Sequence, residues 1–151
     1  MKITVLRLIN VVVAALLAGT SFGIWVGFNP VNYSPHTYIE QQQNLVTSLN
    51  TLMVSLVVGA TIITLVSAYL QRKNRFDFIT LLIAAFFFAS CIFISRFGNY
   101  PIQSAMLHWD PNSLPENWTT MRDTWWTMHK IRTISELIAL VLVAWTGVRK
   151  Q

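Results

Sequence analysis

The sequence has few charged residues and only one cysteine. Charged residues make up 11% of the 151-residue chain, whereas 54% of the residues are hydrophobic. Because a soluble domain is usually about a quarter charged, this composition excludes an ordinary soluble domain and indicates a membrane protein. The lone Cys91 excludes an intrachain disulfide and a cysteine-based metal cluster. We expect it to be a small hydrophobic residue that faces either lipid or the core.

Long apolar runs are what the sequence does have, at about residues 3–28, 46–70, 76–97 and 128–148. Each approaches or exceeds the ~20 residues that a helix needs to cross a bilayer, and none alternates like a barrel strand. We therefore predict an all-α fold, a four-transmembrane-helix bundle in which residues 1–151 form a single domain. The first run also resembles a signal peptide, but its apolar stretch continues to Phe28, which favours a retained span.

The basic residues lie at three places: the N-terminus, the connection between the second and third runs, and the C-terminus. They are Lys2, Arg7, Arg72, Lys73, Arg75, Arg149 and Lys150. The positive-inside rule places all three on the cytoplasmic side, so we predict cytoplasmic N- and C-termini. The net charge of +5 is then a topology signal, and we expect the partner to be a lipid bilayer, with no nucleic acid. The size and loops favour a multi-pass protein of the bacterial inner membrane.

Two helix surfaces have a composition of their own. In the second run, polar residues recur at three- and four-residue steps, at Gln41, Asn44, Ser48, Thr51 and Ser55. We expect this polar face to turn into the bundle, because lipid offers it no partner. The first run carries small residues at Gly19, Gly23 and Gly27. Such a ridge permits close helix packing, either inside the bundle or in a homodimer.

Local signals predict where several helices begin and end. Ser34 is suited to cap a short helix that has Pro35 at its first position. Gly98 is a plausible C-terminal cap for the third helix, which places Arg96 in its last turn. For Arg96 itself, capping and snorkelling explain its position better than a ligand contact does.

The fourth helix has a start signal well before its apolar run. Asp110 opens a turn, and Ser113 with Glu116 has the spacing of a capping box. We therefore predict a helix from near Leu114 to Val148, about 50 Å long at 1.5 Å per residue. A helix of that length exceeds the hydrocarbon thickness, so its first turns should protrude on the outer side or the helix should tilt.

One face of this fourth helix carries aromatic and ionisable residues. Steps of four and three residues separate Trp118, Arg122, Trp125, His129, Arg132 and Glu136. A charge at the bilayer centre costs ~2.5 to 3.5 kcal/mol on insertion scales, and pairing Arg132 with Glu136 on adjacent turns offsets part of that cost.

Two interpretations of this stripe compete. In the structural one, the tryptophans form an interfacial belt and the arginines snorkel to headgroups; the belt would comprise Trp109, Trp118, Trp125 and Trp126. This interpretation leaves Glu136 too deep to escape. In the functional one, the stripe lines a pocket that opens to the outer side, opposite the polar face of the second helix.

The residue types suit acid–base work on a flat molecule. His129 exchanges protons near neutrality, and Arg122 and Arg132 are suited to hold an oxyanion or enolate. A metal site built from His36, His108 and His129 is disfavoured, because no two of them share helical ligand spacing, and we expect no metal.

The segments "GNYPIQ", "HWDP" and "NWTTMRDTWWTMHKIRT" resemble the anthrone oxygenase-like family of small four-helix integral membrane proteins, a domain of unknown function in bacteria. In that family Asn-x-Pro-[Leu/Ile]-Asn ends the third helix, and Trp-x3-Arg-x2-Trp-x3-His-x2-Arg-Thr opens the fourth. The matching residues here are Asn99, Pro101, Ile102, Gln103, Trp118, Arg122, Trp125, His129, Arg132 and Thr133. Gln103 departs from the usual asparagine by one methylene, which leaves the substrate more open than the fold.

The resemblance implies an oxygenase that acts on a flat phenolic or quinone-like substrate and needs no metal or flavin cofactor. In that hypothesis His129 removes a proton, and Arg122 and Arg132 stabilise the anion. The substrate-binding residues would be Trp118, Trp125, Asn99, Gln103 and Glu136. The alternative is a non-catalytic subunit that binds a lipid, a quinone or a neighbouring helix. A transporter is a weaker third alternative, because the chain lacks inverted repeats.

Overall fold

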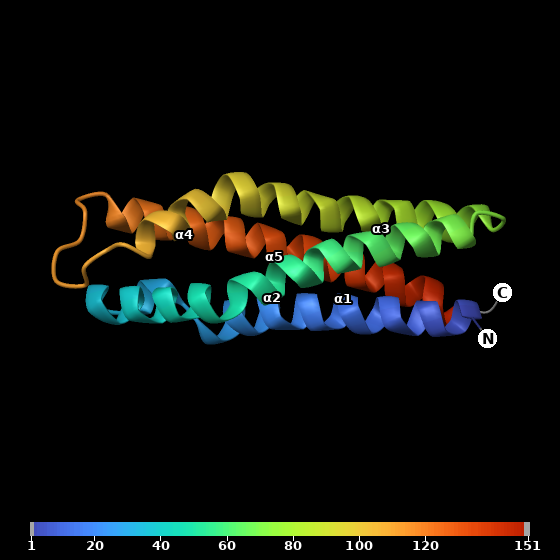
Figure 1. Ribbon diagram of the computed structural model, residues 1–151, viewed down its shortest axis with the longest axis horizontal. Helices are drawn as coiled ribbons and strands as arrows, with labels where there is room; N and C mark the ends of the chain where they lie inside the picture. The colour runs from blue at the N-terminus through green and yellow to red at the C-terminus, as the bar shows by residue number, and fades with distance from the viewer. Residues whose placement is uncertain (1, 150–151) are drawn as a thin grey trace.

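The computed structural model describes residues 2–149, and its regular elements are helices. In chain order they are α1 (Lys2–Gly27), the 3₁₀ turn η1 (Pro30–Asn32), α2 (Pro35–Leu70), α3 (Arg75–Ile94), the π-helical turn η2 (Ser95–Asn99), α4 (Tyr100–Met106) and α5 (Trp118–Val148). Since α3, η2 and α4 follow one another directly, the described chain makes four long helical segments, packed side by side (Figure 1).

All four segments are long and apolar enough to cross a membrane. The prediction of an all-α bundle of four such helices is confirmed. Both ends of the described chain lie at one end of the bundle, beside the turn between α2 and α3 (Figure 1). This arrangement follows from an even number of antiparallel segments joined by short connections.

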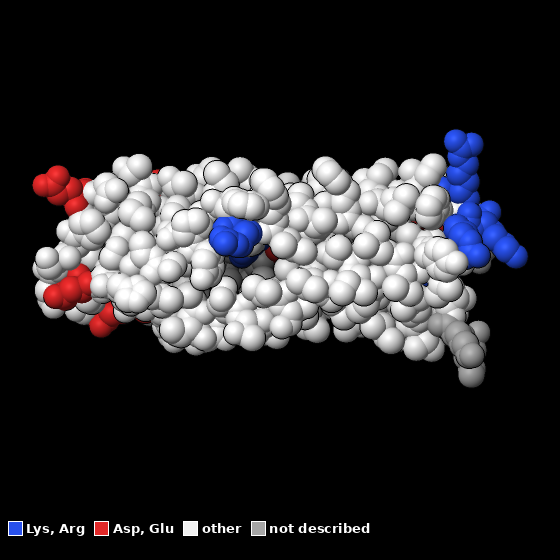
Figure 2. All heavy atoms as spheres, turned by 45° about the horizontal axis from the view of Figure 1, so that its top comes forward, with Lys and Arg blue, Asp and Glu red and all other residues white. Residues whose placement is uncertain are grey.

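The charged side chains are segregated along the bundle. On the face shown in Figure 2, blue atoms gather at the end that carries the termini and red atoms at the opposite end. Such a distribution is compatible with cytoplasmic termini, and the orientation in a membrane stays a prediction. Of the basic residues behind it, Lys150 and the side chain of Lys2 lie outside the described part of the chain.

Helix α2 begins earlier than the second apolar run. The Ser34 hydroxyl accepts a hydrogen bond from the Thr37 N–H at 3.2 Å, with Pro35 at the first helical position, as predicted. The prediction that this cap starts a separate short helix is wrong. One helix of 36 residues continues from Pro35 to Leu70, about 54 Å at 1.5 Å per residue.

The third segment does not end at Gly98, so the predicted cap there is wrong. Gly98 lies inside the π-helical turn, and no described glycine has a positive φ. The Tyr100 N–H bonds to the Ser95 carbonyl, five residues back. Because Pro101 has no N–H and its ring disfavours regular helix on its N-terminal side, a wider turn lets the helix continue through it into α4.

Helix α5 begins at Trp118, four residues after the predicted start, so the capping box at Ser113 is wrong. Asp110 and Ser113 pair in an isolated bridge, and the Asn112 N–H donates to the Asp110 carboxylate at 2.9 Å. These bonds hold the segment in a turn. The helix has 31 residues, which is about 46 Å instead of 50 Å.

Buried apolar residues form two clusters along the bundle. The larger joins α1, α2, α3 and α5 and includes Leu17, Phe88 and Cys91. Cys91 therefore faces the core, which is one of the two surroundings expected for it. The second lies toward the α4–α5 end and includes Trp125 and Trp126, with Trp109 and Trp118 packed against it; these tryptophans pack inward as a cluster instead of forming a belt around the bundle.

The polar face of α2 points away from the bundle, so the predicted burial is wrong. All five of its residues are exposed: Gln41, Asn44, Ser48, Thr51 and Ser55. Its hydroxyls bond within their own helix, for example from Ser55 to the Thr51 carbonyl at 2.8 Å. Such bonds satisfy a hydroxyl without a neighbouring helix.

The glycine ridge of α1 is also exposed. A Cβ atom added at Gly19, Gly23 or Gly27 would meet no atom of the described chain within 4 Å. Of the two interpretations of this ridge, packing inside the bundle is therefore wrong. A homodimer through it stays a prediction.

Candidate functional site

A cavity of about 330 Å³ lies between α2, the π-helical turn with α4, and α5. Its polar lining comes from Asn50, Ser95, Arg96, Tyr100, Gln103, Arg132 and Glu136, and α2 contributes an apolar wall of Met53, Val54, Val57 and Val58. The volume falls at the lower end of the range for small-molecule sites. We call this space the central cavity.

The mouth of the central cavity is on the flank of the bundle. Its lining residues Asn50, Val54, Arg96 and Tyr100 are exposed, and they come from two neighbouring segments. Figure 2 shows a hollow on this face near mid-length, next to a group of blue atoms. The predicted placement of the pocket opposite the polar face of α2 is wrong, because that face points away from the bundle. Its opening to the outer side stays a prediction.

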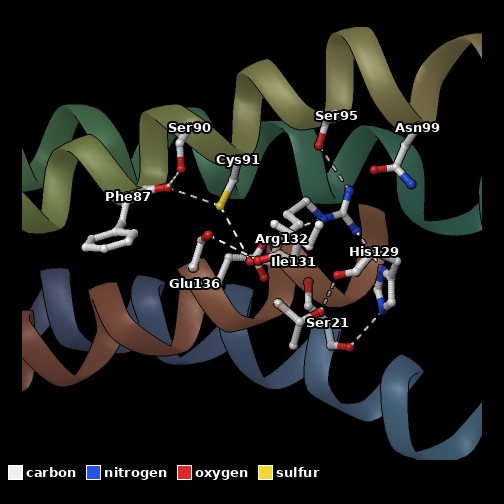
Figure 3. A network of polar contacts seen from close by, with 12 residues as sticks. Ser21, Phe87, Ser90, Cys91, Ser95, Asn99, His129, Ile131, Arg132 and Glu136 are labelled. Carbon is white, nitrogen blue, oxygen red and sulfur yellow. Dashed lines mark hydrogen bonds and ion pairs between the residues drawn. The ribbon is translucent and has the colours of Figure 1, made fainter. Parts of the chain in front are cut away.

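Arg132 is the centre of a polar network inside the bundle (Figure 3). Its Nη1 donates to the Ser95 hydroxyl at 3.1 Å, and its Nη2 donates to His129 Nδ1 at 3.2 Å. Its Nε lies 3.5 Å from Glu136 Oε1, one helical turn away. The guanidinium is therefore fixed from three directions and still forms part of the cavity wall.

His129 is fully buried, and both of its ring nitrogens have protein partners. Since an arginine only donates, Nδ1 must accept the bond from Arg132 and carry no proton. Nε2 then carries the proton and donates it to the Ser21 carbonyl of α1 at 3.2 Å. This neutral tautomer orients the Arg132 guanidinium and has no free lone pair.

The His129 ring is also held by its neighbours on α5. It stacks on Trp125 at 5.3 Å between ring centroids and on Trp126 at 5.5 Å, with interplanar angles of 6° and 11°. Phe28 packs edge-on against both tryptophans. The ring has little freedom to rotate, which suits a residue that positions another.

Glu136 is the carboxylate of the central cavity. It is 1% exposed, and its polar neighbours among residues 2–149 are the Arg132 guanidinium and the Ser21 side chain. A buried carboxylate oxygen of this kind is costly unless something satisfies it. Because an ionised carboxylate has about four acceptor sites, Glu136 keeps acceptor capacity beyond these two neighbours.

A smaller cavity of about 40 Å³ adjoins the central one and shares Asn50, Met53, Gln103 and Arg132 with it. His129, Trp125 and Gln42 also line it. Gln42 is fully buried, and neither atom of its amide is bonded to another described residue. The polar lining thus extends from Glu136 past Arg132 toward α2.

The structure brings together part of the set of residues predicted for the site. Arg132, Glu136 and Gln103 line the central cavity, while His129 and Trp125 line its smaller neighbour. These residues share the inward face of α5, apart from Gln103 on α4.

The remaining predicted residues lie elsewhere. Arg122 donates to its neighbour Asp123 at 2.8 Å and lies over the Trp118 ring, 5.1 Å from its centroid. Trp118 in turn packs against Tyr38. Asn99 is buried and donates to the Trp125 carbonyl at 3.1 Å, which ties the π-helical turn to α5. Neither cavity described above includes Arg122, Trp118 or Asn99 in its lining.

Several lining residues were missed by the sequence reasoning. The regular spacing of the polar face of α2 predicts that this face lines the pocket. It does not include Asn50 or Gln42, which lie elsewhere on the helix surface and line the cavities. Arg96 was assigned to a helix end, yet it lines the cavity from inside a continuing helix. A signal was available for Gln42, because it starts a buried stripe with Val46, Met53 and Val57.

The three histidines weighed as metal ligands lie apart. His36 pairs with Glu40 at 3.3 Å, His108 bonds to the Ser104 carbonyl, and His129 is inside the bundle. No group of three or more metal-ligating side chains from His, Cys, Asp and Glu occurs within the described residues.

Comparison with known proteins gives one family. The model of a family described as Anthrone oxygenase matches residues 43–142, about two thirds of the chain and most of both cavity linings. No curated protein matches the chain significantly, and neither does any solved structure.

Proposed function

This chain belongs to the anthrone oxygenase family, and on that premise we propose that it is a membrane oxygenase acting on a flat phenolic substrate. The reaction would convert a ring methylene to a carbonyl with molecular oxygen in the central cavity. The observation that carries the proposal is the buried pair of Arg132 and Glu136 in a wall that is otherwise largely apolar.

In this proposal Glu136 is the general base. Glu136 lines the central cavity and keeps acceptor capacity beyond its contacts with Arg132 and Ser21, so it can accept a proton from a carbon acid. The sequence reasoning gave this task to His129. The contacts of His129 support a positioning role, because Arg132 occupies the nitrogen that a base would need.

Arg132 would stabilise the anion formed next to Glu136. A guanidinium has five N–H groups, and the contacts with Ser95, His129 and Glu136 leave some of them for a ligand. A fixed cation beside the developing charge lowers the barrier without reorganising during the reaction. Gln103, and Tyr100 at the mouth, are suited to bind the substrate oxygens.

The proposed reaction conserves atoms and electrons. Glu136 takes one proton from the ring methylene, and the electron pair left on carbon reduces oxygen to a peroxide anion as the new C–O bond forms. Glu136 then returns its proton to the outer oxygen of the peroxide. The resulting hydroperoxide carries the second hydrogen of the methylene on the same carbon. Loss of that hydrogen with cleavage of the O–O bond leaves the carbonyl and releases one water. One oxygen atom thus enters the product and the other becomes water.

The experiment supplies an anthrone to membranes that contain the protein, with membranes lacking it as the blank for autoxidation. We expect quinone formation to consume one oxygen molecule per product and to introduce one labelled atom from ¹⁸O₂. Glu136→Gln should lower the rate about 100-fold or more, the usual contribution of a general base. Glu40→Gln, at an exposed carboxylate of α2, is the matched control and should retain the rate.

Equal rates in the wild type and the blank would refute the oxygenase. A Glu136→Gln rate within about threefold of the wild type would refute the assigned base while leaving the reaction in place.

One observation favours the second candidate, a non-catalytic binding subunit. The exposed glycine ridge of α1 borders an open groove of about 370 Å³ that Gly23, Gly27, Tyr33 and Gln41 line together with α2. Gly23→Leu should leave the monomer intact, because no described atom lies near its Cβ. If this candidate is right, the substitution disrupts a stoichiometric complex with a copy or partner in mild detergent; a monomeric wild type would count against it.

A further inference from the structure

The charged residues that line the central cavity do not cancel. Arg132 lies next to Glu136, whereas Arg96 has no carboxylate within ion-pair distance anywhere in residues 2–149. Its guanidinium lies near two rings, 5.3 Å from the Tyr100 centroid and 5.8 Å from the Phe97 centroid. The lining therefore carries one positive charge in excess.

The position of Arg96 makes this excess charge costly. Arg96 is exposed on the flank of the bundle. The exposed side chains of this surface include the apolar Phe93, Phe97 and Val54. An unpaired cation at such a surface is unfavourable unless an anion or a headgroup compensates it.

We propose that Arg96 binds the anionic group of a flat aromatic ligand that enters the central cavity from the bilayer. This rests on the proposed function for the position of the reactive ring beside Glu136. The anion would lie at the mouth against Arg96 and Tyr100, and the ring would lie along Met53 and Val57 of α2. Arg132, already paired, then serves the reacting end, while Arg96 selects ligands that carry a single negative charge.

The cavity favours a compact aromatic anion over a phospholipid. Its volume of about 330 Å³ is at the small end of ligand sites and cannot enclose two acyl chains. Acyl chains would also leave the polar groups inside the cavity without hydrogen-bond partners, which is unfavourable.

The test compares two probes that share one ring system, anthraquinone-2-carboxylate and anthraquinone-2-carboxamide. Affinities are measured by calorimetry with the full chain in phosphatidylcholine nanodiscs, after subtracting the partition of each probe into empty nanodiscs. We expect the wild type to bind the carboxylate about tenfold more tightly, the effect of one charge-assisted hydrogen bond.

The variants assign that preference to one residue. Arg96→Gln should bind both probes alike, with carboxamide affinity unchanged, which would show that the cavity is intact. Arg96→Lys should retain a preference of at least about threefold, because a lysine keeps the charge. The matched control Arg75→Gln removes an exposed arginine from the other end of the same segment and should behave as the wild type.

Three results would overturn the inference: equal or absent binding of the two probes by the wild type, a full preference in Arg96→Gln, or, in nanodiscs prepared with added phosphatidylglycerol, Arg96-dependent enrichment of that lipid around the protein without any carboxylate preference. The last would assign Arg96 to lipid phosphate. The binding measurement involves no turnover. A protein that prefers the carboxylate but oxidises no anthrone would therefore refute the proposed function and leave the role of Arg96 in place. Conversely, anthrone oxidation without that preference would refute only the role of Arg96.

Discussion

Two arginine–carboxylate pairs lie inside this helix bundle, and they connect different elements. Near the end that carries the termini, Arg7 of α1 lies 3.6 Å from Asp77 of α3 and also donates to Gln71, which follows α2. At mid-length, Arg132 and Glu136 lie one turn apart on α5 itself, 3.5 Å from each other. The first pair therefore joins three parts of the chain, whereas the second joins one helix to itself.

The groups around the two pairs also differ: hydrogen-bonded side chains surround the first, and the central cavity adjoins the second. Around the Arg7 pair, the Asn74 amide donates to Asp77 at 3.0 Å, and Thr64 donates to Asn10 at 2.9 Å. Around the Arg132 pair, both members line the central cavity. The comparison suggests that the first pair stabilises the packing of helices and the second serves a ligand.

The largest effect on stability should come from Asp77→Ala. This substitution leaves the part-buried Arg7 without its carboxylate, and breaking a buried pair typically costs about 3 to 5 kcal/mol. We expect a loss of about 3 kcal/mol in the free energy of unfolding, measured by denaturant titration in mixed micelles. The folded fraction should keep its rate of anthrone oxidation. A loss below about 1 kcal/mol would remove the distinction between the two pairs.

Glu136→Gln should behave in the opposite way. We expect the rate of oxidation to fall about 100-fold, while the free energy of unfolding changes by less than about 1 kcal/mol, because Arg132 keeps its bonds to Ser95 and His129. The same titration and the same oxidation assay measure both quantities. A large loss of stability with little loss of activity would reverse the comparison.

Substitutions of His129 separate a base from a positioning residue. In His129→Asn the introduced amide oxygen can replace Nδ1 as the acceptor for Arg132, but an amide cannot take up a proton as a base does. We expect about a tenfold loss of kcat in His129→Ala and a loss of less than about threefold in His129→Asn, because only the first variant removes the acceptor. Equally inactive variants of normal stability would restore the interpretation of His129 as the base.

The smallest expected change in stability concerns two glycines, one near the central cavity and one near the termini. A Cβ at Gly98, near the central cavity, would lie 3.1 Å from Met128 Cγ, whereas one at Gly147, near the termini, would meet Val11 at an ordinary 3.7 Å. We expect Gly98→Ala to destabilise the protein by about 1 kcal/mol and Gly147→Ala to change stability by less than about 0.5 kcal/mol. Thermal unfolding of the pair in one detergent measures the difference. Equal effects would show that the π-helical turn is no more tightly packed than the helix end.

The sequence predicted the fold better than the site. Apolar runs of sufficient length indicate helices because no other open structure satisfies its backbone bonds in lipid. The spacing from Trp118 to Glu136 also predicts that these side chains share a face, and Trp125, His129 and Glu136 are indeed buried together. It could not predict that Arg122 would pair with its neighbour Asp123, since a long side chain at a helix edge can reach several partners.

The errors share a physical cause. The signals at Gly98 and Ser113 are local, and each was overridden by its surroundings: Pro101 and the packing of Met128 in the first case, and the turn held by Asp110 in the second. Local capping is worth only about 1 kcal/mol, so tertiary packing readily prevails over it.

By itself, the sequence determined that the chain forms four membrane-length helices, that α5 has one polar and aromatic face, and which family the chain belongs to. Only the tertiary structure decided which face of α2 turns inward, where the central cavity opens, and that Arg96 at its mouth has no carboxylate partner among the described residues. Periodicity shows that two faces of a helix differ, but hydroxyls that bond within their own helix, such as Ser55, can face outward at little cost. The direction of each face is set by packing against the neighbouring helices, which no single helix encodes.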